Sequence, residues 1–182
     1  MAIERWEIDS SHSGIHFSVR HLVIAKVGGQ FARWTGTVVA PDGDFNRASV
    51  EVAIDASSID TGVADRDAHL KAAEFFDVAT YPELTFTTTR VEPAGQGRLR
   101  LIGNLTVKGV TRETVFDVDH HGLARDPWGN ERAAFSARAS IDRRDFGLTW
   151  NQVLEAGGVM VGDRVDIEIE VEAVKQAAAK VA

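Results

Sequence analysis

Alternation between hydrophobic and polar residues runs through most of the chain and predicts β-strands. The clearest example lies near the C-terminus, where Val165, Ile167, Ile169 and Val171 are separated by acidic side chains. A strand turns successive side chains to opposite faces, whereas a helix would spread these residues around its axis. With three less regular segments, the pattern predicts eight strands, over residues 15–20, 30–40, 50–55, 84–91, 99–107, 113–122, 133–141 and 165–172.

Most segments between these strands have the composition of short turns, as in residues 41–44 and 126–130. Short turns favour an antiparallel up-and-down order, and closure into a barrel would remove the exposed sheet edges. Two segments differ. Residues 64–76 are helix formers and predict one short helix, and residues 147–162 predict a long loop before the last strand. The predicted fold is therefore an all-β, eight-stranded antiparallel barrel.

The domain organisation is expected to be simple. The chain has 182 residues, which is the size of one domain. No internal repeat or linker-like change of composition divides it, so residues 1–175 are expected to form a single barrel domain. The Ala-rich end, residues 176–182, is expected to fray.

The interior of an eight-stranded barrel either is filled by its own side chains or holds one small ligand. The faces predicted to point inward include Gly103, Ala133, Ala137 and Ala139. Small residues leave volume unfilled, which favours a cavity, although Phe side chains on opposing strands could fill it.

Residues 30–40 do not give a single phase of alternation. Phe31 and Trp34 have opposite parity. A regular strand would turn at most one of them inward unless a bulge intervenes.

Composition and charge exclude several classes of function. Lys and Arg number 20 and Asp and Glu number 27, so the net charge is 20 − 27 = −7, which argues against a nucleic-acid partner. The absence of Cys excludes disulfides, Cys-ligated zinc, iron–sulfur clusters and thiol nucleophiles. Charges at residues 4, 5, 7 and 9 leave no apolar signal region, and no apolar stretch approaches the ~20 residues of an integral membrane segment. A cytoplasmic location is expected.

Eight short segments, in order along the chain, resemble those of one known family. They are DSSHSGIHFSVRHL (9–22), SIDT (58–61), RDAHL (66–70), FFD (75–77), YPELTF (81–86), GNLTVKGVT (103–111), IDRRDFGL (141–148) and GGVMVGD (157–163). Each is weak alone, but together they resemble the YceI family of lipocalin-like, polyisoprenoid-binding proteins over nearly the whole chain.

The resemblance implies an elongated barrel around a deep hydrophobic pocket. It implies binding, storage or transport of a long-chain isoprenoid lipid, a quinone or a similar amphiphile, with no required cofactor and no catalytic residues. By analogy with the family, a homodimer is expected. The bound lipid or quinone is the expected ligand, and neither a nucleic-acid partner nor an integral membrane segment is expected.

The predicted pocket walls consist of apolar residues on the inward phase of their strands, with others from the helix and the long loop. They are Phe17, Val19, Val52, Ile54, Phe86, Leu105 and Phe135 on strands, Phe76 from the helix segment, and Phe146, Leu148 and Trp150 from the loop. Burial of apolar area contributes about 25 cal/mol per Å², without directed hydrogen bonds. The same pattern would also arise from ordinary core residues.

Charged residues near the helix and the last loop could contact a polar head group. The candidates are Arg66 and Asp67 at the start of the helix and Arg143 and Asp145 after a strand. The alternative is that they hold the helix and loops to the barrel by charge-assisted hydrogen bonds.

Three other functions compete with a lipid carrier. The first is an enzyme acting on such a lipid, with His16, His21, Arg143 or Asp145 as acid–base groups. The second is a haem- or pigment-binding barrel with one axial His, and the third is an interaction module with a filled barrel. No metal site is expected from His12 and His16, because four residues of strand span ~13 Å.

Overall fold

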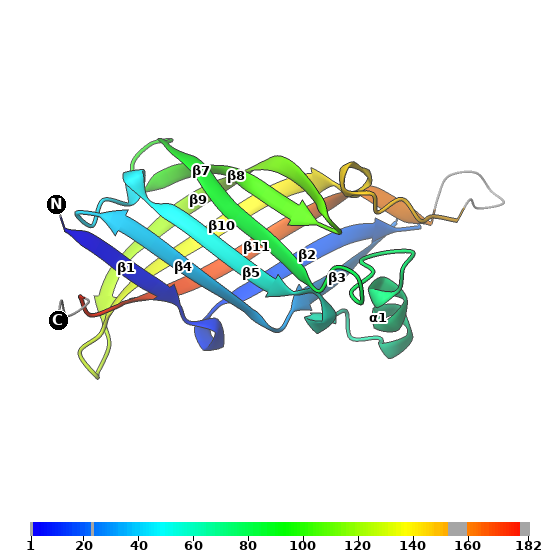
Figure 1. The fold of residues 1–182 in the computed structure, drawn as a ribbon, viewed down its shortest axis with the longest axis horizontal. Coiled ribbons are helices and arrows are strands. Elements are labelled where there is room, and N and C mark those ends of the chain that lie inside the picture. Colours follow the sequence, from blue (N-terminus) through cyan, green and yellow to red (C-terminus); the bar gives the residue numbers. More distant parts are fainter. Residues whose placement is uncertain (1, 23, 153–159, 179–182) are drawn as a thin grey trace.

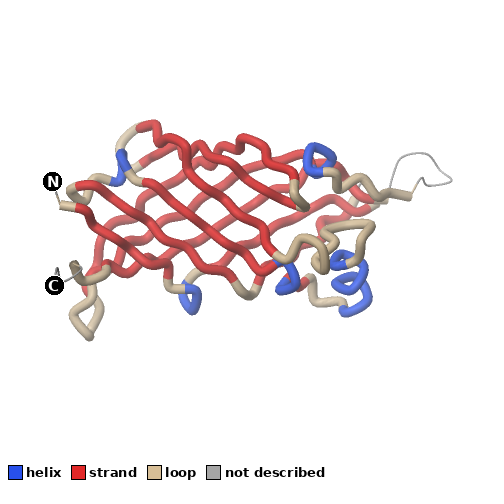
Figure 2. The backbone as a smooth tube through the Cα atoms, in the orientation of Figure 1, coloured by secondary structure: helices blue, strands red, loops and turns tan. Residues whose placement is uncertain are grey.

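Strands run along most of the described chain, which comprises residues 2–22, 24–152 and 160–178 of the computed structural model, and they wind into a barrel (Figures 1 and 2). The strands are β1 (Ile3–Ile8), β2 (Gly14–His21), β3 (Ala25–Phe31), β4 (Trp34–Pro41), β5 (Ser49–Asp55), β6 (Ile59–Asp60), β7 (Glu83–Pro93), β8 (Arg98–Val107), β9 (Val110–Arg125), β10 (Glu131–Asp142) and β11 (Val161–Lys175). The helical elements are α1 (Ala64–Lys71) and the 3₁₀ turns η1 (Ser10–His12), η2 (Phe45–Arg47), η3 (Ala56–Ser58) and η4 (Arg143–Phe146).

The barrel closes because β11 pairs with both ends of the strand order. The ring is β1-β4-β5-β7-β8-β9-β10-β11, and β11 returns to pair with β1; every pairing is antiparallel. Three positions of the ring are interrupted strands. β2 continues β1 along the same edge of β11, β3 precedes β4, and β6 follows β5 and pairs with β3. The prediction of an eight-stranded antiparallel barrel with one helix is therefore confirmed for the described residues.

The interruption between β3 and β4 accounts for the conflicting parity of Phe31 and Trp34. Residues 32 and 33 leave the sheet, so the alternation of inward and outward side chains restarts at Trp34. Phe31 and Trp34 are consequently both buried. The irregularity is thus a break between two strands and not the bulge considered from the sequence.

Strand β1 was not among the predicted strands. Half of its sequence, IERWEI, is charged, and only Trp6 and Ile8 provide an inward apolar face. Trp6 is nevertheless the most deeply buried large side chain at its end of the barrel, packed with Val38, Ala133 and Ala173. A single Trp supplies little periodic signal, although it supplies a large buried area.

The helix is shorter than predicted, because α1 ends at Lys71 rather than at Phe76. Beyond it the chain folds back, with the amide of Phe76 donating to the carbonyl of Leu70. This turn brings both Phe75 and Phe76 against the barrel cavity. In a continued helix they would point about 100° apart, since α-helices have 3.6 residues per turn.

The two ends of the barrel differ. The N-terminal and C-terminal ends of the described chain lie together at one end, and α1 packs at the opposite end (Figure 1). The long loop predicted before the last strand follows η4, but residues 153–159 of it lie outside the described residues. Residues 176–178 have no regular structure and 179–182 are also outside the described part, so a frayed tail stays a prediction.

A substitution at Gly103 of β8 would test how tightly the barrel wall is packed. A Cβ atom at this position would collide with the backbone oxygen of Thr87 and would lie 2.6 Å from Cζ of Phe86. We expect Gly103→Ala to reduce the free energy of unfolding by about 1–3 kcal/mol, as overpacking does. Urea denaturation measures the change. The control is Gly28→Ala in β3, where the nearest atom would be 3.7 Å away, and an equal loss in both variants would contradict this reading.

Candidate functional site

An apolar cavity of about 590 Å³ runs inside the barrel. Four alternate residues of β11, from Val165 to Val171, line it. Six steps along a strand correspond to about 20 Å, and the tilt of about 35–45° in a barrel shortens this span to about 15 Å along the axis. The cavity is therefore elongated and apolar, and the barrel is not filled by its own side chains.

Ten of the eleven predicted wall residues border this cavity. They are Phe17, Val19, Val52, Ile54, Phe76, Phe86, Leu105, Phe135, Leu148 and Trp150. Phe146 does not border it. Its side chain lies in η4, is only 2 % exposed and packs within the core cluster of the barrel wall. Phe146 therefore packs behind the lining, in the same core cluster as Leu148, whereas Leu148 and Trp150 after the turn border the cavity.

The small inward residues contribute unequally to the free volume. Ala137 lines the cavity, but Gly103, Ala133 and Ala139 do not. Phe86 occupies the space beside Gly103, and Ala133 is fully buried among the side chains around Trp6. The inference from small residues to free volume is therefore right for Ala137 and wrong for the other three.

Several cavity residues were absent from the predicted walls. Phe31 and Trp34 were obscured by the strand break, and Phe45 lies in the turn η2, where no periodic pattern exists. Phe116 of β9 could have been found, since Thr114, Phe116 and Val118 alternate inward along that strand. Phe45 also packs against Trp6, with ring centroids 5.6 Å apart, and so helps to close the end near the termini.

Polar lining residues gather at the α1 end of the cavity. They are His21 of β2, Thr61, and Asp65, Arg66 and His69 of α1, together with Arg143. At the other end the lining is apolar, and behind it Trp6 and Ala173 are buried. The mouth of the cavity is therefore at the α1 end. The ring of His69 lies edge-on to Phe75 and Trp150, with centroids 5.0 and 4.7 Å away, and links the helix to the long loop.

Arg66 and Asp67 both bind Thr61, which precedes the helix. Nε of Arg66 donates to the hydroxyl of Thr61 at 2.8 Å, and Asp67 accepts from the Thr61 amide at 2.8 Å. The hydrogen bonds from Thr61 lower the pKa of Asp67. Arg66 borders the cavity and Asp67 does not, so only Arg66 of this pair is placed to meet a head group.

Arg143 is buried and holds the long loop. Its side chain is oriented by hydrogen bonds to the carbonyl oxygens of Leu148 at 2.6 Å, Trp150 at 2.9 Å and Gly162 at 2.9 Å. Burial lowers its pKa from the usual value. Since most of its donors are used by the backbone, Arg143 shapes the rim of the cavity. Asp145 is exposed and lies outside the cavity lining.

The acid–base candidates do not converge on one point of the cavity. His16 and Asp145 are exposed on the outside, whereas His21 and Arg143 border the mouth. At the opposite end, His120 stacks on Phe135 with centroids 4.7 Å apart, and burial lowers the pKa of its imidazole. Within the described chain, its Nε2 and the Nε1 of Trp6 are buried without a hydrogen-bond partner.

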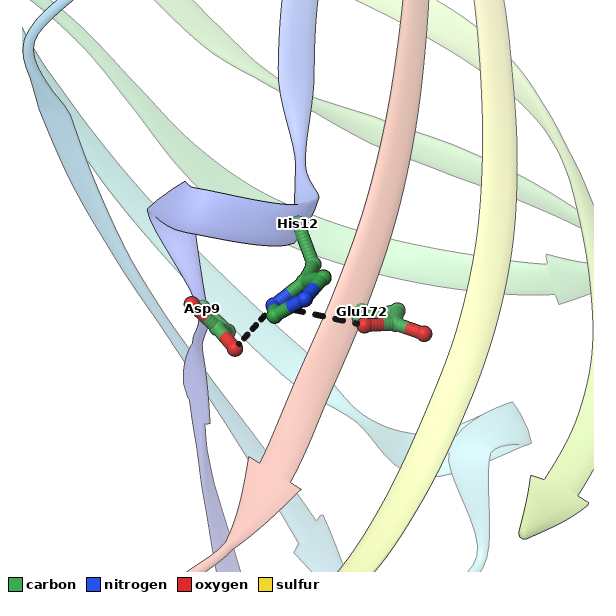
Figure 3. A group of neighbouring side chains, drawn as sticks. All are labelled: Asp9, His12 and Glu172. Atoms are coloured by element: carbon green, nitrogen blue, oxygen red, sulfur yellow. Dashed lines mark hydrogen bonds and ion pairs between the residues drawn. The ribbon is translucent and has the colours of Figure 1, made fainter. Parts of the chain in front are cut away.

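Asp9, His12 and Glu172 bring three metal-ligating groups within 4.8 Å of one another on the outside of the barrel (Figure 3). A guanidinium already lies against the two carboxylates. Nη1 of Arg132 is 2.9 Å from Asp9 and 3.4 Å from Glu172, and its Nε is 2.9 Å from Asp126. This arrangement is an ion-pair network that joins η1, β10 and β11.

Removal of the Arg143 side chain tests its role in the loop. We expect Arg143→Met to reduce the free energy of unfolding by at least about 2 kcal/mol, because each hydrogen bond to a charged group contributes about 1.5–3 kcal/mol. Thermal or urea denaturation measures it, and limited proteolysis reports on residues 147–160. Arg144→Met is the control, since Arg144 is exposed and pairs with Asp142. Equal stability of the two variants would rule out this role.

The Arg132 network predicts a pH dependence of stability. Hydrogen bonds from Ser11, Arg132 and His12 lower the pKa of Asp9. Burial opposes ionisation of Asp126, but hydrogen bonds from Arg132 and Asn130 outweigh it and lower the pKa of Asp126 to about 2. Carboxyls with depressed pKa values stabilise the fold above their unfolded pKa near 3.8, and this contribution is lost as the pH falls toward 2. Urea unfolding between pH 7 and pH 2 should therefore show a decline below pH 4 that is shallower in Arg132→Gln.

The control for this measurement is Arg5→Gln. Arg5 is exposed and pairs with Glu7 on its own strand. Its pH profile should follow that of the unmodified protein. A decline in Arg132→Gln as steep as in the unmodified protein would mean that Arg132 does not depress these pKa values.

Comparison with known sequences assigns the barrel to a family. The profile of the YceI-like domain matches residues 6–173, which is nearly the whole chain. The chain belongs to the YceI-like domain family. In this YceI-like chain, no helix among the described residues has both the length and the apolar character to cross a membrane.

Individual relatives agree with this assignment. The chain is similar to UPF0312 protein SAS2572 of Staphylococcus aureus (strain MSSA476), with 34 % identity over 90 % of this chain and 94 % of the relative. The crystal structure of the Campylobacter jejuni YCEI protein matches with 29 % identity, a TM-score of 0.75, and 87 % and 90 % of the two chains. A polyisoprenoid binding domain from Saccharophagus degradans has the same fold, with 15 % identity, a TM-score of 0.70, and 94 % and 98 % coverage.

Proposed function

We propose that this YceI-like protein is a non-catalytic carrier of a long-chain isoprenoid lipid, a quinone or a similar amphiphile. The observation that carries the proposal is the apolar cavity that runs along the barrel, closed at the end near the termini and polar only at the α1 end. A molecule with a long hydrocarbon tail and one polar end matches this distribution.

The energetics suit such a ligand. Transfer of an isoprenoid tail from water into the cavity is favourable by about 25 cal/mol for each Å² of apolar area removed from water. The walls are aliphatic and aromatic side chains, which require no directed bond from the tail. Arg66, His21 and His69 border the cavity at its mouth, and in this proposal they are the groups that meet the polar head group. The fold shared with a domain described as polyisoprenoid binding supports the same ligand class.

The competing functions predict features other than an apolar cavity with a polar mouth. An enzyme would bring acid–base groups together near the reacting atoms, and the four candidates are dispersed, with His16 and Asp145 outside the cavity. A haem or pigment binder would give a coloured protein. The cytoplasmic location and the homodimer expected from the sequence stay predictions.

Filling the cavity tests the proposal. Ala137 of β10 lines it. We expect Ala137→Trp to reduce the uptake of a prenyl lipid at least about tenfold, because the added ring occupies the space of several tail carbons, each contributing about 0.8 kcal/mol. Displacement of a lipophilic fluorescent dye by geranylgeraniol measures the uptake. Native mass spectrometry with organic extraction identifies any lipid carried by the unmodified protein.

The matched control is Arg138→Trp, which places the same ring on the exposed outer face of the same strand. This variant should retain uptake. If the unmodified protein carries no extractable lipid and takes up neither geranylgeraniol nor a fatty amphiphile, the carrier function is rejected.

A further inference from the structure

The hairpin between β2 and β3 projects exposed hydrophobic side chains beyond the mouth of the cavity. Leu22 is 42 % exposed and Ile24 is 87 % exposed. His21, next to Leu22, lines the cavity, as do Val19 and Val27 further along the two strands. The hairpin thus continues the cavity wall into solvent at the α1 end, away from both termini (Figure 1).

The same hairpin differs in charge from the rest of the chain. Residues 10–41 contain no Asp or Glu, although the chain has 27 acidic residues. The basic residues of this stretch are Arg20, Lys26 and Arg33. Among the described residues only Arg33 of these three forms an ion pair within 4.0 Å, with Asp55 at 3.0 Å, and Lys26 lies on the same outer surface as Asp166. The hairpin is a basic element in a protein of net charge −7.

Arg20 and Lys26 are directly opposite each other across the hairpin and are both exposed. Like charges at directly opposite positions of neighbouring strands repel and destabilise the pair. An external surface of negative charge would remove this repulsion. Exposed aliphatic residues flanked by basic ones are the composition with which proteins contact anionic membranes, because the apolar groups enter the acyl boundary and the cations stay among the head groups.

We propose that the β2–β3 hairpin docks the cavity mouth onto an anionic lipid membrane, with Leu22 and Ile24 entering the lipid and Arg20 and Lys26 contacting its head groups. The two exposed cations of the hairpin are attracted by the anionic surface, which favours contact through this hairpin. This deepens the proposed carrier function, since a hydrocarbon tail would pass between bilayer and cavity without crossing water. Docking itself needs no bound ligand.

Vesicle flotation tests the docking. The purified chain is mixed at low ionic strength with vesicles of phosphatidylcholine alone, or with vesicles in which phosphatidylglycerol replaces part of it. We expect binding to the anionic vesicles, weakened by added salt. Ile24→Ser should weaken it at least about fivefold through lost apolar transfer. The double variant Arg20→Gln, Lys26→Gln should weaken it at least about tenfold, since one basic residue near such a surface contributes about 1 kcal/mol, or fivefold.

Trp128→Ser is the matched control. Trp128 is 81 % exposed in the β9–β10 turn, at the end of the barrel opposite α1 (Figure 1). The Trp128→Ser variant should leave vesicle binding unchanged within about twofold. All variants alter exposed side chains, and unchanged thermal denaturation confirms that they fold.

Two results would overturn the proposal: no binding of the unmodified protein to anionic vesicles, or equal losses of binding in Ile24→Ser and Trp128→Ser. If the unmodified protein binds no vesicles and forms a dimer that Ile24→Ser loses, the hairpin contacts a second copy of the chain instead. Failure of the carrier function would look different. The protein would then bind anionic vesicles but carry no extractable lipid and take up no geranylgeraniol.

Discussion

Closure of the sheet by β11 is the constraint on which the structure depends. This strand of 15 residues pairs with β10 along one edge and with β1 and then β2 along the other. A closed barrel leaves no edge to pair with other chains, and it fixes which side chains face inward at every position. The alternating sequence of β11 satisfies both demands, with aliphatic residues inward and acidic residues outward.

The division of the interior into a closed end and an open cavity follows from a few large side chains. Trp6 and Phe45 fill the end near the termini, where they pack with Ala133 and Ala173. Between them and α1, aliphatic residues and Ala137 leave space along the barrel axis. At the mouth, Arg143 binds backbone carbonyls of the long loop, so a buried charge supports the rim of an otherwise apolar site.

The sequence predicted the elements that alternate regularly, and with them the barrel and most of the cavity wall. It did not reveal β1, where charged residues hide a single buried Trp6, nor the role of Phe45, which acts from a turn without periodicity. Phe146 illustrates the opposite error. It is apolar and lies two residues before the cavity residue Leu148, but it packs in the core and does not border the cavity. The polar contacts of Arg143 depend on residues up to 19 positions away, which no local pattern encodes.

The placement of both ends of the described chain opposite α1 has a practical consequence. A linker joined to either end would emerge behind the Trp6 cluster and would leave the mouth unobstructed. Molecules tethered to a support in this way would all present the cavity outward. Exchange of lipid with a facing bilayer could then be followed one molecule at a time in a defined orientation.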